Sequence, residues 1–187
     1  MFVKRFLLPL MVSSAPLLCQ QTMAGEAFIM PEVGRTEIKF KPDVVLPGFD
    51  TEVLGGAVGF VAGYKFDSNF FVGASHSFSS NDSFFETFDH YDLREFGFTA
   101  GYALHISEHF RIVPAVGFNS YTIDFDEGRL FNPGEEDSRE IDGEDFYWRI
   151  NVEIPFTELI QMNFAYIDGD YDFGDTSSLR VGLKLSF

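Results

Sequence analysis

Three aspartates at alternate positions, Asp168, Asp170 and Asp172, could act as metal ligands. Carboxylate oxygens are the donors that Ca²⁺ and Mg²⁺ prefer. The run departs from the EF-hand loop, because Phe173 stands where that loop needs glycine and Leu179 stands where it needs glutamate. We therefore expect loosely bound Ca²⁺ or Mg²⁺ here and no tightly held cofactor. The alternative is a solvated, charged loop surface.

His76 lies between Ser75 and Ser77, and a histidine beside a hydroxyl group could serve as the general base of a hydrolase. On an extended strand, however, both serines project from the face opposite to the histidine, and Phe78 follows on the histidine's own face. The arrangement fits hydrolysis only if a bulge shifts the register. The alternative is a histidine at the outer rim of the fold.

Seven charged residues stand singly among small and polar residues, at alternate positions of otherwise apolar segments: Lys65, Glu95, Arg111, Arg149, Glu153, Arg180 and Lys184. If these segments close into a barrel, all seven side chains project into its interior. They could then line an ion path, or pair with one another and fill the lumen. A narrow lumen favours pairing, and we expect Arg149 and Lys184 to pair with Glu153.

Apolar residues at every second position predict the strands that carry these groups. Seven such segments are clear: 54–66, 70–78, 94–105, 110–125, 146–154, 159–167 and 179–187. An eighth, at 34–41, is supported only by Ile38 and Phe40, which alternate with Glu37, Lys39 and Lys41. The chain therefore predicts an all-β fold of eight antiparallel strands.

The connections between the strands alternate between short and long. Residues 67–69, 106–109 and 155–158 form short turns, whereas longer acidic segments cover 42–53, 79–93, 126–145 and 168–178. One end of the molecule then carries tight turns and the other carries large loops. Transmembrane β-barrels have this plan, and an even strand number fits it.

The two faces of the strands differ in size, which indicates which face points outward. One face carries most of the Phe, Leu and Val, and the other carries Gly, Ala, Ser, Thr, Asn and the seven charges. A small barrel cannot enclose the bulky set, so a soluble barrel of the lipocalin kind is disfavoured and the bulky face meets lipid. Four aromatic residues are expected at the borders of the apolar band: Tyr64, Tyr102, Trp148 and Tyr166.

The first 24 residues have the layout of a secretory signal peptide, with Lys4 and Arg5 before an apolar run and small residues near Ala24. We place cleavage after Ala24, which leaves residues 25–187 as one barrel domain. Cys19, the only cysteine, lies inside this segment. A lipidated Cys19 is the alternative, but Leu18 stands where a lipoprotein signal needs a small residue.

The formal net charge of −16 excludes the broad basic surface that nucleic-acid binding requires. The 24 Phe and 17 Gly also exclude an acidic disordered chain, which would have few aromatic residues. Much of the negative charge lies in the segments 126–145 and 168–178. These segments therefore predict a strongly negative loop end.

The last strand alternates up to the final residue, with Leu179, Val181, Leu183, Leu185 and Phe187 on one face. This ending resembles the assembly signal of bacterial outer-membrane barrel proteins. The whole layout is similar to the small eight-stranded outer-membrane barrels of the OmpA-transmembrane-domain and OmpX type. The resemblance implies export to a Gram-negative outer membrane, recognition by the outer-membrane assembly machinery, and contact with membrane lipid and lipopolysaccharide.

The resemblance leaves the function open, because such barrels include adhesins, lipid-A enzymes and proteins of no known activity. We expect a non-enzymatic monomer with a structural or surface-interaction role through its acidic loops. Divalent cations shared with lipopolysaccharide phosphates would relieve the repulsion between two negative surfaces. One alternative is a lipid-A-modifying hydrolase that uses His76. A second is a narrow ion-conducting pore.

Overall fold

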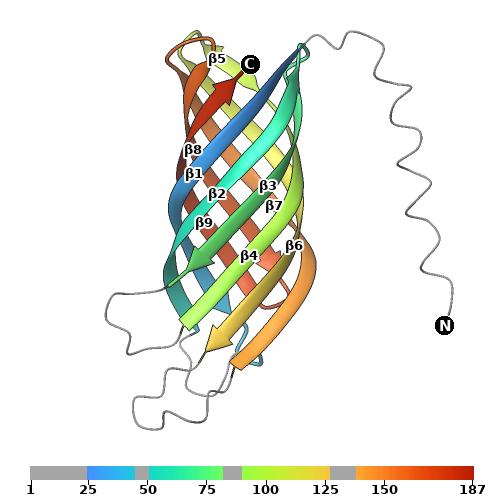
Figure 1. Ribbon diagram of the computed structural model, residues 1–187, viewed down its shortest axis with the longest axis vertical. Coiled ribbons are helices and arrows are strands. Elements are labelled where there is room, and N and C mark those ends of the chain that lie inside the picture. Colours follow the sequence, from blue (N-terminus) through green and yellow to red (C-terminus); the bar gives the residue numbers. More distant parts are fainter. Residues whose placement is uncertain (1–24, 45–50, 82–89, 127–137) are drawn as a thin grey trace, which may run out of the picture.

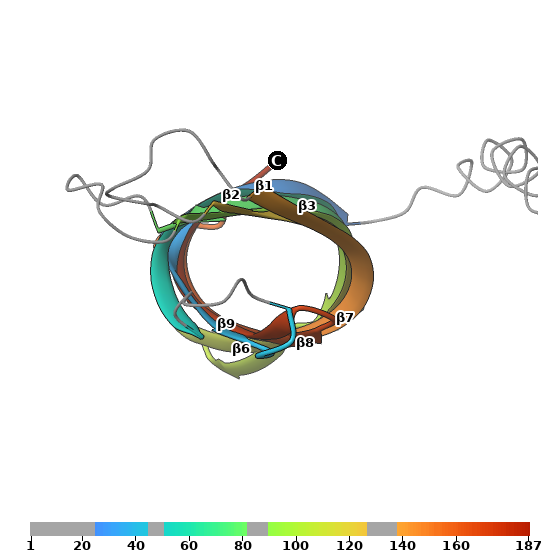
Figure 2. The same cartoon turned by 90° about the horizontal axis from the view of Figure 1, so that it is seen from below.

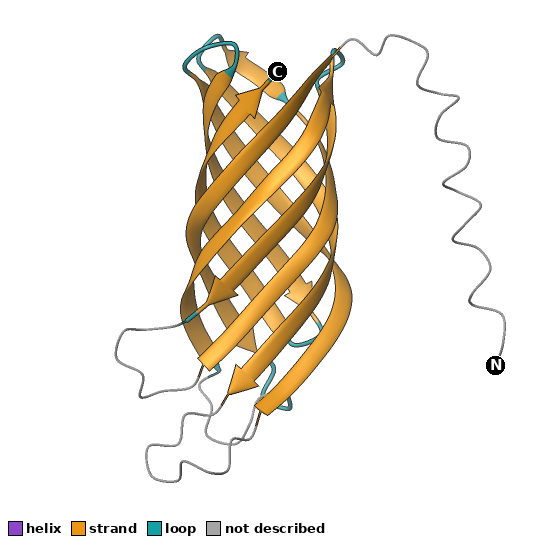
Figure 3. Cartoon of the chain, viewed as in Figure 1, coloured by secondary structure: helices purple, strands orange, loops and turns teal. Residues whose placement is uncertain are grey.

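The computed structural model describes residues 25–44, 51–81, 90–126 and 138–187. In these ranges the chain forms strands joined by turns and no helix (Figure 3). The strands are β1 (Gly25–Phe40), β2 (Glu52–Phe66), β3 (Phe70–Ser80), β4 (His90–Tyr102), β5 (Leu104–Ser107), β6 (Phe110–Asp126), β7 (Ser138–Pro155), β8 (Ile160–Tyr171) and β9 (Gly174–Ser186). Within the described part of the chain, no helix has the length and apolar character needed to cross a membrane.

The strands close into a single antiparallel barrel (Figures 1 and 2). Both β4 and β5 pair with β6, and they are separated only by Ala103, whose backbone N–H donates to the carbonyl oxygen of Asn69 at 2.9 Å. They therefore count as one interrupted strand, and the barrel has the eight strands that the sequence predicts. The pairing of β1 with β9 completes the ring, so the described sheet has no long unpaired edge.

The first strand is much longer than the sequence pattern indicates. It begins at Gly25, and its register with β2 runs from Gly25 opposite Phe66 to Lys39 opposite Glu52. The expected segment 34–41 captures only its second half. The expected orientation is also wrong there, because Ile38 and Phe40 are buried inside the barrel while Lys39 is exposed outside.

The alternation of apolar and polar residues reverses along β1, because the surroundings of the strand change along its length. In the first half of β1, Val33 faces outward with 61% exposure and Glu32 is buried inside. In the second half the apolar residues, Ile38 and Phe40, are inside instead. No uniform alternation runs through the strand, so a search for one finds only the end.

The connections are shorter than expected at two places. β7 begins at Ser138, so Glu140, Asp142 and Glu144 belong to a strand and not to a loop. The segment 168–178 is likewise not a long loop, because β8 continues to Tyr171 and β9 begins at Gly174. Gly174 permits this tight hairpin: its φ is +153°, and a Cβ there would collide with the carbonyl oxygen of Lys39.

One end of the barrel has short turns, and the other end has most of the long connections (Figure 1). The chain's C-terminus and the start of β1 lie at the short-turn end. The predicted signal peptide and parts of the long connections lie outside the described residues. Cleavage of a signal peptide after Ala24 therefore stays a prediction.

The outer wall has an apolar band, as the sequence predicts. Outward side chains that belong to this band and are more than half exposed are Val33, Val58, Phe96, Phe98, Val116 and Phe146. Towards the long-loop end, outward positions of the same strands become charged, for example Lys39 on β1, Arg94 on β4 and Glu140 on β7. The barrel wall therefore continues beyond its apolar band.

The interior is divided into three layers. A small apolar cluster fills the short-turn end: Phe28, Met30, Val61, Phe71, Ala103, Val113 and Ala115. A larger cluster fills the long-loop end: Ile38, Phe40, Tyr91, Leu93, Tyr121, Ile123, Phe125, Tyr171 and Phe173. We call the barrel section around this second cluster the stem. Polar and charged side chains fill the layer between them.

The stem corrects the expectation that the interior holds only small and polar residues. Five Phe or Tyr rings of this nine-residue cluster meet edge-on or tilted at about 5 Å across the barrel interior, for example Phe40 with Phe125 and Tyr121 with Phe173. Such packing resembles the core of a soluble barrel. The reason is that water lies outside this section, so the apolar side chains must turn inward.

Candidate functional site

The buried ion pairs of the middle layer form the first candidate site. All seven charges selected from the sequence point into the barrel, on β2, β4, β6, β7 and β9. Lys65 lies nearest the short-turn end, where its Nζ is 2.8 Å from Glu26 Oε1. Arg111 also lies near this end, and the other five are buried deeper in the barrel.

Arg149 forms the central ion pair with Glu32. An Arg149 Nη2 is 2.6 Å from Glu32 Oε1, and both side chains are 3% exposed or less. Arg149 Nε also donates to Asn151 Oδ1 at 2.9 Å, and Asn163 Nδ2 donates to the same Glu32 oxygen at 3.1 Å. The charges are therefore both paired and hydrogen-bonded, which a buried ion pair requires.

This pair differs from the one expected, because Arg149 does not contact Glu153. The two residues lie four positions apart on β7, which separates them by roughly 13 Å along the strand. Glu32 reaches Arg149 from β1, across the lumen. It was missed because the predicted first strand did not extend back to residue 32.

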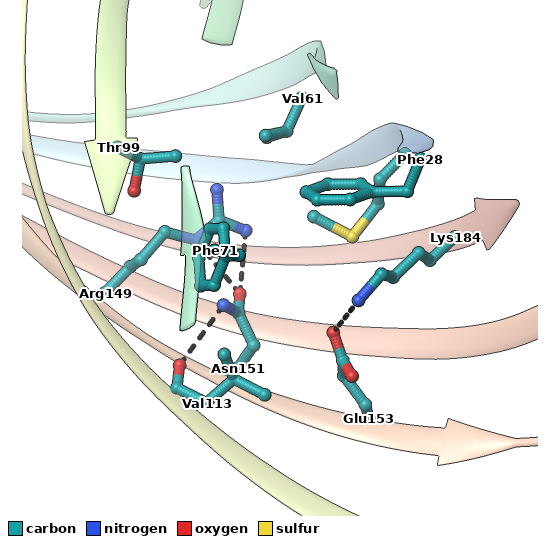
Figure 4. Close-up of a pocket in the computed structure, with 10 residues that line it drawn as sticks. Phe28, Val61, Phe71, Thr99, Val113, Arg149, Asn151, Glu153 and Lys184 are labelled. Atoms are coloured by element: carbon teal, nitrogen blue, oxygen red, sulfur yellow. Dashed lines mark hydrogen bonds and ion pairs between the residues drawn. The ribbon is translucent and has the colours of Figure 1, made fainter. Parts of the chain in front are cut away.

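Glu153 pairs with Lys184, the other partner expected for it. Their Nζ–Oε1 distance is 2.9 Å, and Lys184 Nζ also lies 4.7 Å from the centre of the Phe28 ring (Figure 4). Arg111 is opposite Glu153 in the β6–β7 register and donates to Gln161 Oε1 at 3.4 Å. This group lies beside the apolar cluster of the short-turn end.

Glu95 is the centre of a second polar group, which lies on the short-turn side of the stem. Its carboxylate accepts hydrogen bonds from Ser77 at 2.5 Å, Tyr171 at 2.8 Å and Asn119 at 3.1 Å. Arg180 Nη2 lies 3.6 Å from Glu95 Oε2. A carboxylate with three hydrogen bonds and a cation nearby is held in one orientation.

The interior leaves little room for an ion path. A hollow of about 10 Å³ lies beside Arg149, Asn151, Glu153 and Lys184, and one of about 20 Å³ lies among Glu32, Glu95 and Arg180. Each volume suits a single water molecule. Six of the seven charges thus have an oppositely charged partner within 4 Å, and Arg111 donates to Gln161 instead.

His76 is on the outer wall, as its position in the alternation predicts. Its Nδ1 is 2.9 Å from the carbonyl oxygen of Glu95, and its ring contacts Phe60 edge-on at 6.0 Å. Ser77 points into the barrel, where it donates to Glu95. The outward residues directly across from His76 are Phe60 and Phe96, so the described strands place no hydroxyl nucleophile beside it.

The three candidate cation ligands do not converge. Asp168 accepts a hydrogen bond from Tyr166 at 2.9 Å, Asp170 lies 3.4 Å from Lys41 Nζ, and the backbone N–H of Asp172 donates to Asp145 at 3.1 Å. Across residues 25–44, 51–81, 90–126 and 138–187, no three His, Cys, Asp or Glu side chains are grouped to hold a metal ion. Loose cation binding by these aspartates stays a prediction.

A different acidic group lies on the outer wall of the stem. Asp124 on β6 and Glu140 and Asp142 on β7 face outward, and Thr122 donates to Asp142 at 2.5 Å. Repulsion by Asp124, and then by Asp142, raises the pKa of the Glu140 carboxyl group above its ordinary value. Arg94 opposes this effect and lies 3.9 Å from Asp124. The sequence pattern indicates a loop at Glu140 and Asp142, so this group was not predicted.

The closing strand and the border residues have the positions that the alternation predicts. Leu179, Val181 and Leu183 face outward with 41–50% exposure, and Leu185 lies on the same face. Phe187 is 74% exposed, and its backbone exchanges two hydrogen bonds with Ala27, of 3.0 and 3.2 Å. Whether this strand is read as an assembly signal stays a prediction.

Two of the predicted border aromatics lie near each end of the apolar band. Tyr64 is opposite Ala27 near the short-turn end, and Tyr102 ends β4 there. Trp148 and Tyr166, whose rings are 5.3 Å apart, lie near the charged stem. This spacing brackets a lipid-facing band.

A closed antiparallel barrel with an apolar outer band and a polar, filled interior is a transmembrane β-barrel. The chain belongs to the outer membrane protein beta-barrel domain family, whose model matches residues 10–187. The short-turn end accordingly faces the periplasm, and the stem faces the cell exterior. None of the curated protein sequences matches the chain.

Solved structures confirm the fold at low sequence identity. Neisserial surface protein A has a TM-score of 0.68 and 10% identity, over 86% of this chain and 97% of that one. The attachment invasion locus protein Ail of Yersinia pestis has a TM-score of 0.59 and 14% identity, over 87% and 99%. OprG of Pseudomonas aeruginosa has a TM-score of 0.53 and 13% identity, over 87% and 96%.

Proposed function

We propose that this protein is a non-enzymatic outer-membrane barrel whose acidic stem serves as a rigid surface for binding cations or a cationic partner. The observation that carries the proposal is the continuation of the barrel wall beyond the lipid-facing band. A barrel wall that projects from the membrane holds its side chains in fixed positions, whereas loops alone would not.

The stem is rigid because its interior is packed. Nine buried residues hold β1, β4, β6, β8 and the β8–β9 turn together, and Tyr91, Leu93 and Ile123 are 1% exposed or less. Side chains carried on packed strands pay little ordering entropy when a ligand binds. This supports a binding surface on the stem wall.

The stem wall carries a surplus of negative charge. Its outward carboxylates among the described residues are Glu37, Glu52, Asp92, Asp124, Glu140, Asp142, Glu144, Asp168, Asp170 and Asp175. Lys39, Lys41 and Arg94 each lie within 4 Å of one of these groups already, and Arg35 is a further outward cation, on β1 beside Glu37. The remaining charge needs divalent cations or a basic ligand beside lipopolysaccharide phosphates.

The sign of this charge argues against an anionic ligand. Ail of Yersinia pestis was solved in complex with the heparin analogue sucrose octasulfate, a polyanion. A sulfated molecule would meet repulsive carboxylates on this stem. We therefore assign the opposite preference to this protein.

The two alternative functions lack a supporting observation in the described residues. A hydrolase based on His76 would need a hydroxyl group beside it, where Phe60 and Phe96 lie. A pore would need a continuous lumen, where two apolar clusters and paired charges lie. A lipid-A mass spectrum of a deletion strain should accordingly be unchanged.

The proposal is tested by titrating the mature protein in lipid nanodiscs with Ca²⁺, Mg²⁺ and a polylysine peptide in a calorimeter. The triple variant Asp124→Asn, Glu140→Gln, Asp142→Asn should lose much of the binding heat. A second triple variant, Asp168→Asn, Asp170→Asn, Asp172→Asn, tests the predicted cation ligands of β8.

The matched control removes three exposed carboxylates at the periplasmic end, with Asp67→Asn, Glu108→Gln and Glu158→Gln. This control should bind like the unmodified protein. Equal binding by all four proteins, or no binding by any of them, would contradict the proposal.

A further inference from the structure

The lipid-facing wall contains an apolar trough of about 680 Å³. It crosses five strands, β2, β3, β4, β6 and β7, along two neighbouring rows of the sheet. Tyr64, Val72, Ala100 and Val116 are paired across the strands in one row. Ala74, Phe98, Phe118 and Phe146 are paired in the other.

The shape of the trough follows from the sizes of these side chains. Ala74 and Ala100 form a low floor, because each presents only a methyl group to the membrane. Phe98, Phe118 and Phe146 rise beside the floor, and the rings of Phe118 and Phe146 meet edge-on at 5.1 Å. The result is a channel open to lipid along its length.

The length and direction of the trough match one hydrocarbon chain. Five strands at a spacing of about 4.8 Å give a length of roughly 19 Å. A lipid chain in one leaflet crosses about half of a core of roughly 30 Å, so it extends about 15 Å. Strands of such barrels tilt by about 35–45°, so the row from Tyr64, near the periplasmic border, to Phe146 rises only about 11–14 Å through the membrane, which is the depth of one leaflet.

The chemistry of the lining excludes a partner that needs hydrogen bonds within the trough. The lining is Gly, Ala, Val and Phe apart from Tyr64 and Thr99. The Thr99 hydroxyl is buried and donates to the carbonyl oxygen of Val116. The convex wall of a second barrel would leave the low floor at Ala74 and Ala100 unfilled, whereas a single flexible chain can lie along it.

Charge at the two ends of the trough selects the leaflet. At the stem end, Glu140, Asp142 and Glu144 would repel the phosphates of lipopolysaccharide. At the periplasmic end the neighbouring rings are uncharged: Tyr64 contacts Phe66 at 5.1 Å, and Phe66 stacks on Phe70 at 5.9 Å. Aromatic rings at this depth suit a phospholipid headgroup, including an ammonium group over a ring face.

We propose that the trough between Tyr64 and Phe146 is a binding site for one acyl chain of a phospholipid from the periplasmic leaflet. The glycerol and headgroup lie at the aromatic border formed by Tyr64, Phe66 and Phe70. The chain then crosses the barrel wall diagonally, over Ala100 and Ala74. The trough lies outside the acidic stem, but its assignment to the periplasmic leaflet rests on the negative charge on which the proposed function of the stem also rests.

The test uses the mature protein in nanodiscs that contain a trace of phosphatidylethanolamine with a photoreactive group on its acyl chain. After illumination, adducts are mapped by tandem mass spectrometry. They should concentrate on β3, β4 and β6, at the residues beside Ala74, Ala100 and Val116. Val116→Phe and Ala100→Phe fill the trough and should each cause a several-fold loss of these adducts.

The matched control is Val33→Phe on β1. Val33 is 61% exposed and Val116 is 63% exposed, so both substitutions add a ring to the lipid-facing wall, but only one lies in the trough. Val33→Phe should leave the adduct pattern unchanged. Heat-dependent migration on gels verifies that each variant forms a barrel.

Three results would overturn the proposal. Adducts spread around the barrel in proportion to exposure would mean that no chain is held. Equal labelling of the trough by a photoreactive lipopolysaccharide would assign the site to the other leaflet. Cross-links between two copies of the protein at Val116 would mean that a second barrel covers the trough.

Discussion

The membrane section and the stem are built from the same strands, but apolar residues face outward in the membrane section and inward in the stem. In the membrane section Val33 faces outward and Glu32 inward, and four residues later on β1 the charged Glu37 faces outward and Ile38 inward. The difference lies in the solvent and not in the backbone. Lipid outside allows a polar interior, whereas water outside requires an apolar one.

This comparison also separates what stabilises each section. The stability of the membrane section depends on buried ion pairs in the lumen. Removal of one member leaves the other buried without a partner. The stem depends on burial of Phe, Tyr, Leu and Ile against one another. Substitutions at matched positions should therefore have different effects in the two sections.

The largest effect is expected when one partner of the central ion pair is removed. Arg149→Ala should lower the free energy of unfolding by about 3–5 kcal/mol, because the carboxyl group of Glu32 would be left buried with no cation beside it. The double variant Glu32→Leu, Arg149→Met should recover most of this loss. Urea unfolding in detergent micelles, followed by heat-dependent gel migration, measures both; a cost of Arg149→Ala as small as that of an exposed residue would contradict the pairing.

Truncation of an apolar residue should matter in the stem and not on the lipid-facing wall. Ile123→Ala removes a side chain with no exposure and should cost about 2–5 kcal/mol. Val116→Ala leaves no cavity, because lipid fills the space, and should change stability by less than about 0.5 kcal/mol. Similar losses for the two variants in the same urea assay would mean that the stem core is not packed.

A charge introduced on the outside of β1 tests where the membrane ends. Arg35 already faces outward two residues beyond Val33, so Val33→Arg should cost between the roughly 1 kcal/mol of a charge near the interface and the roughly 2–4 kcal/mol of a charge at the bilayer midplane. Glu37→Arg, four residues further along the same face, should change stability by less than about 0.5 kcal/mol, because it lies in water. If Glu37→Arg were the more costly of the two, the apolar band would have been placed at the wrong height.

The smallest effect concerns the acidic wall of the stem and depends on pH. Repulsion by Asp124 raises the pKa of Glu140, so the folded protein holds that proton more tightly than the unfolded chain does. This contribution to stability is present in full below the ordinary pKa of glutamate and is lost as the pH rises through the raised value. Asp124→Asn should therefore raise the unfolding midpoint at neutral pH and have less effect near pH 4, as measured by urea titration across pH. A midpoint shift that does not depend on pH would contradict the repulsion.

The sequence predicted the membrane section well because its alternation is uniform there. The outward set of β9, from Leu179 to Leu183, and the inward positions of Glu95, Arg149 and Lys184 follow from period two alone. The eight-strand barrel follows from the number of such segments. Each of these inferences needs only the local order of residue types.

The stem and the ion-pair partners could not be predicted in the same way. Ile38 and Phe40 break the alternation of β1, so the strand seemed to begin late and Glu32 was left out. The acidic residues of 138–145 and 168–171 look like loop residues until water is known to lie outside their strands. Pairing across the lumen, such as Glu32 with Arg149, depends on closure of the sheet, which no local pattern contains.

The two apolar clusters that close the lumen also separate its charges from the surrounding electrolyte. Dissolved ions screen charges that they can approach to within a Debye length of about 8 Å at physiological ionic strength. With Phe28 and Phe71 on one side and Phe40 and Phe125 on the other, salt from neither compartment reaches Glu32, Arg149 or Glu95. Repulsion among the stem carboxylates should consequently weaken as the salt concentration rises. The attraction within the buried ion pairs of the lumen should be the same at low and at high salt.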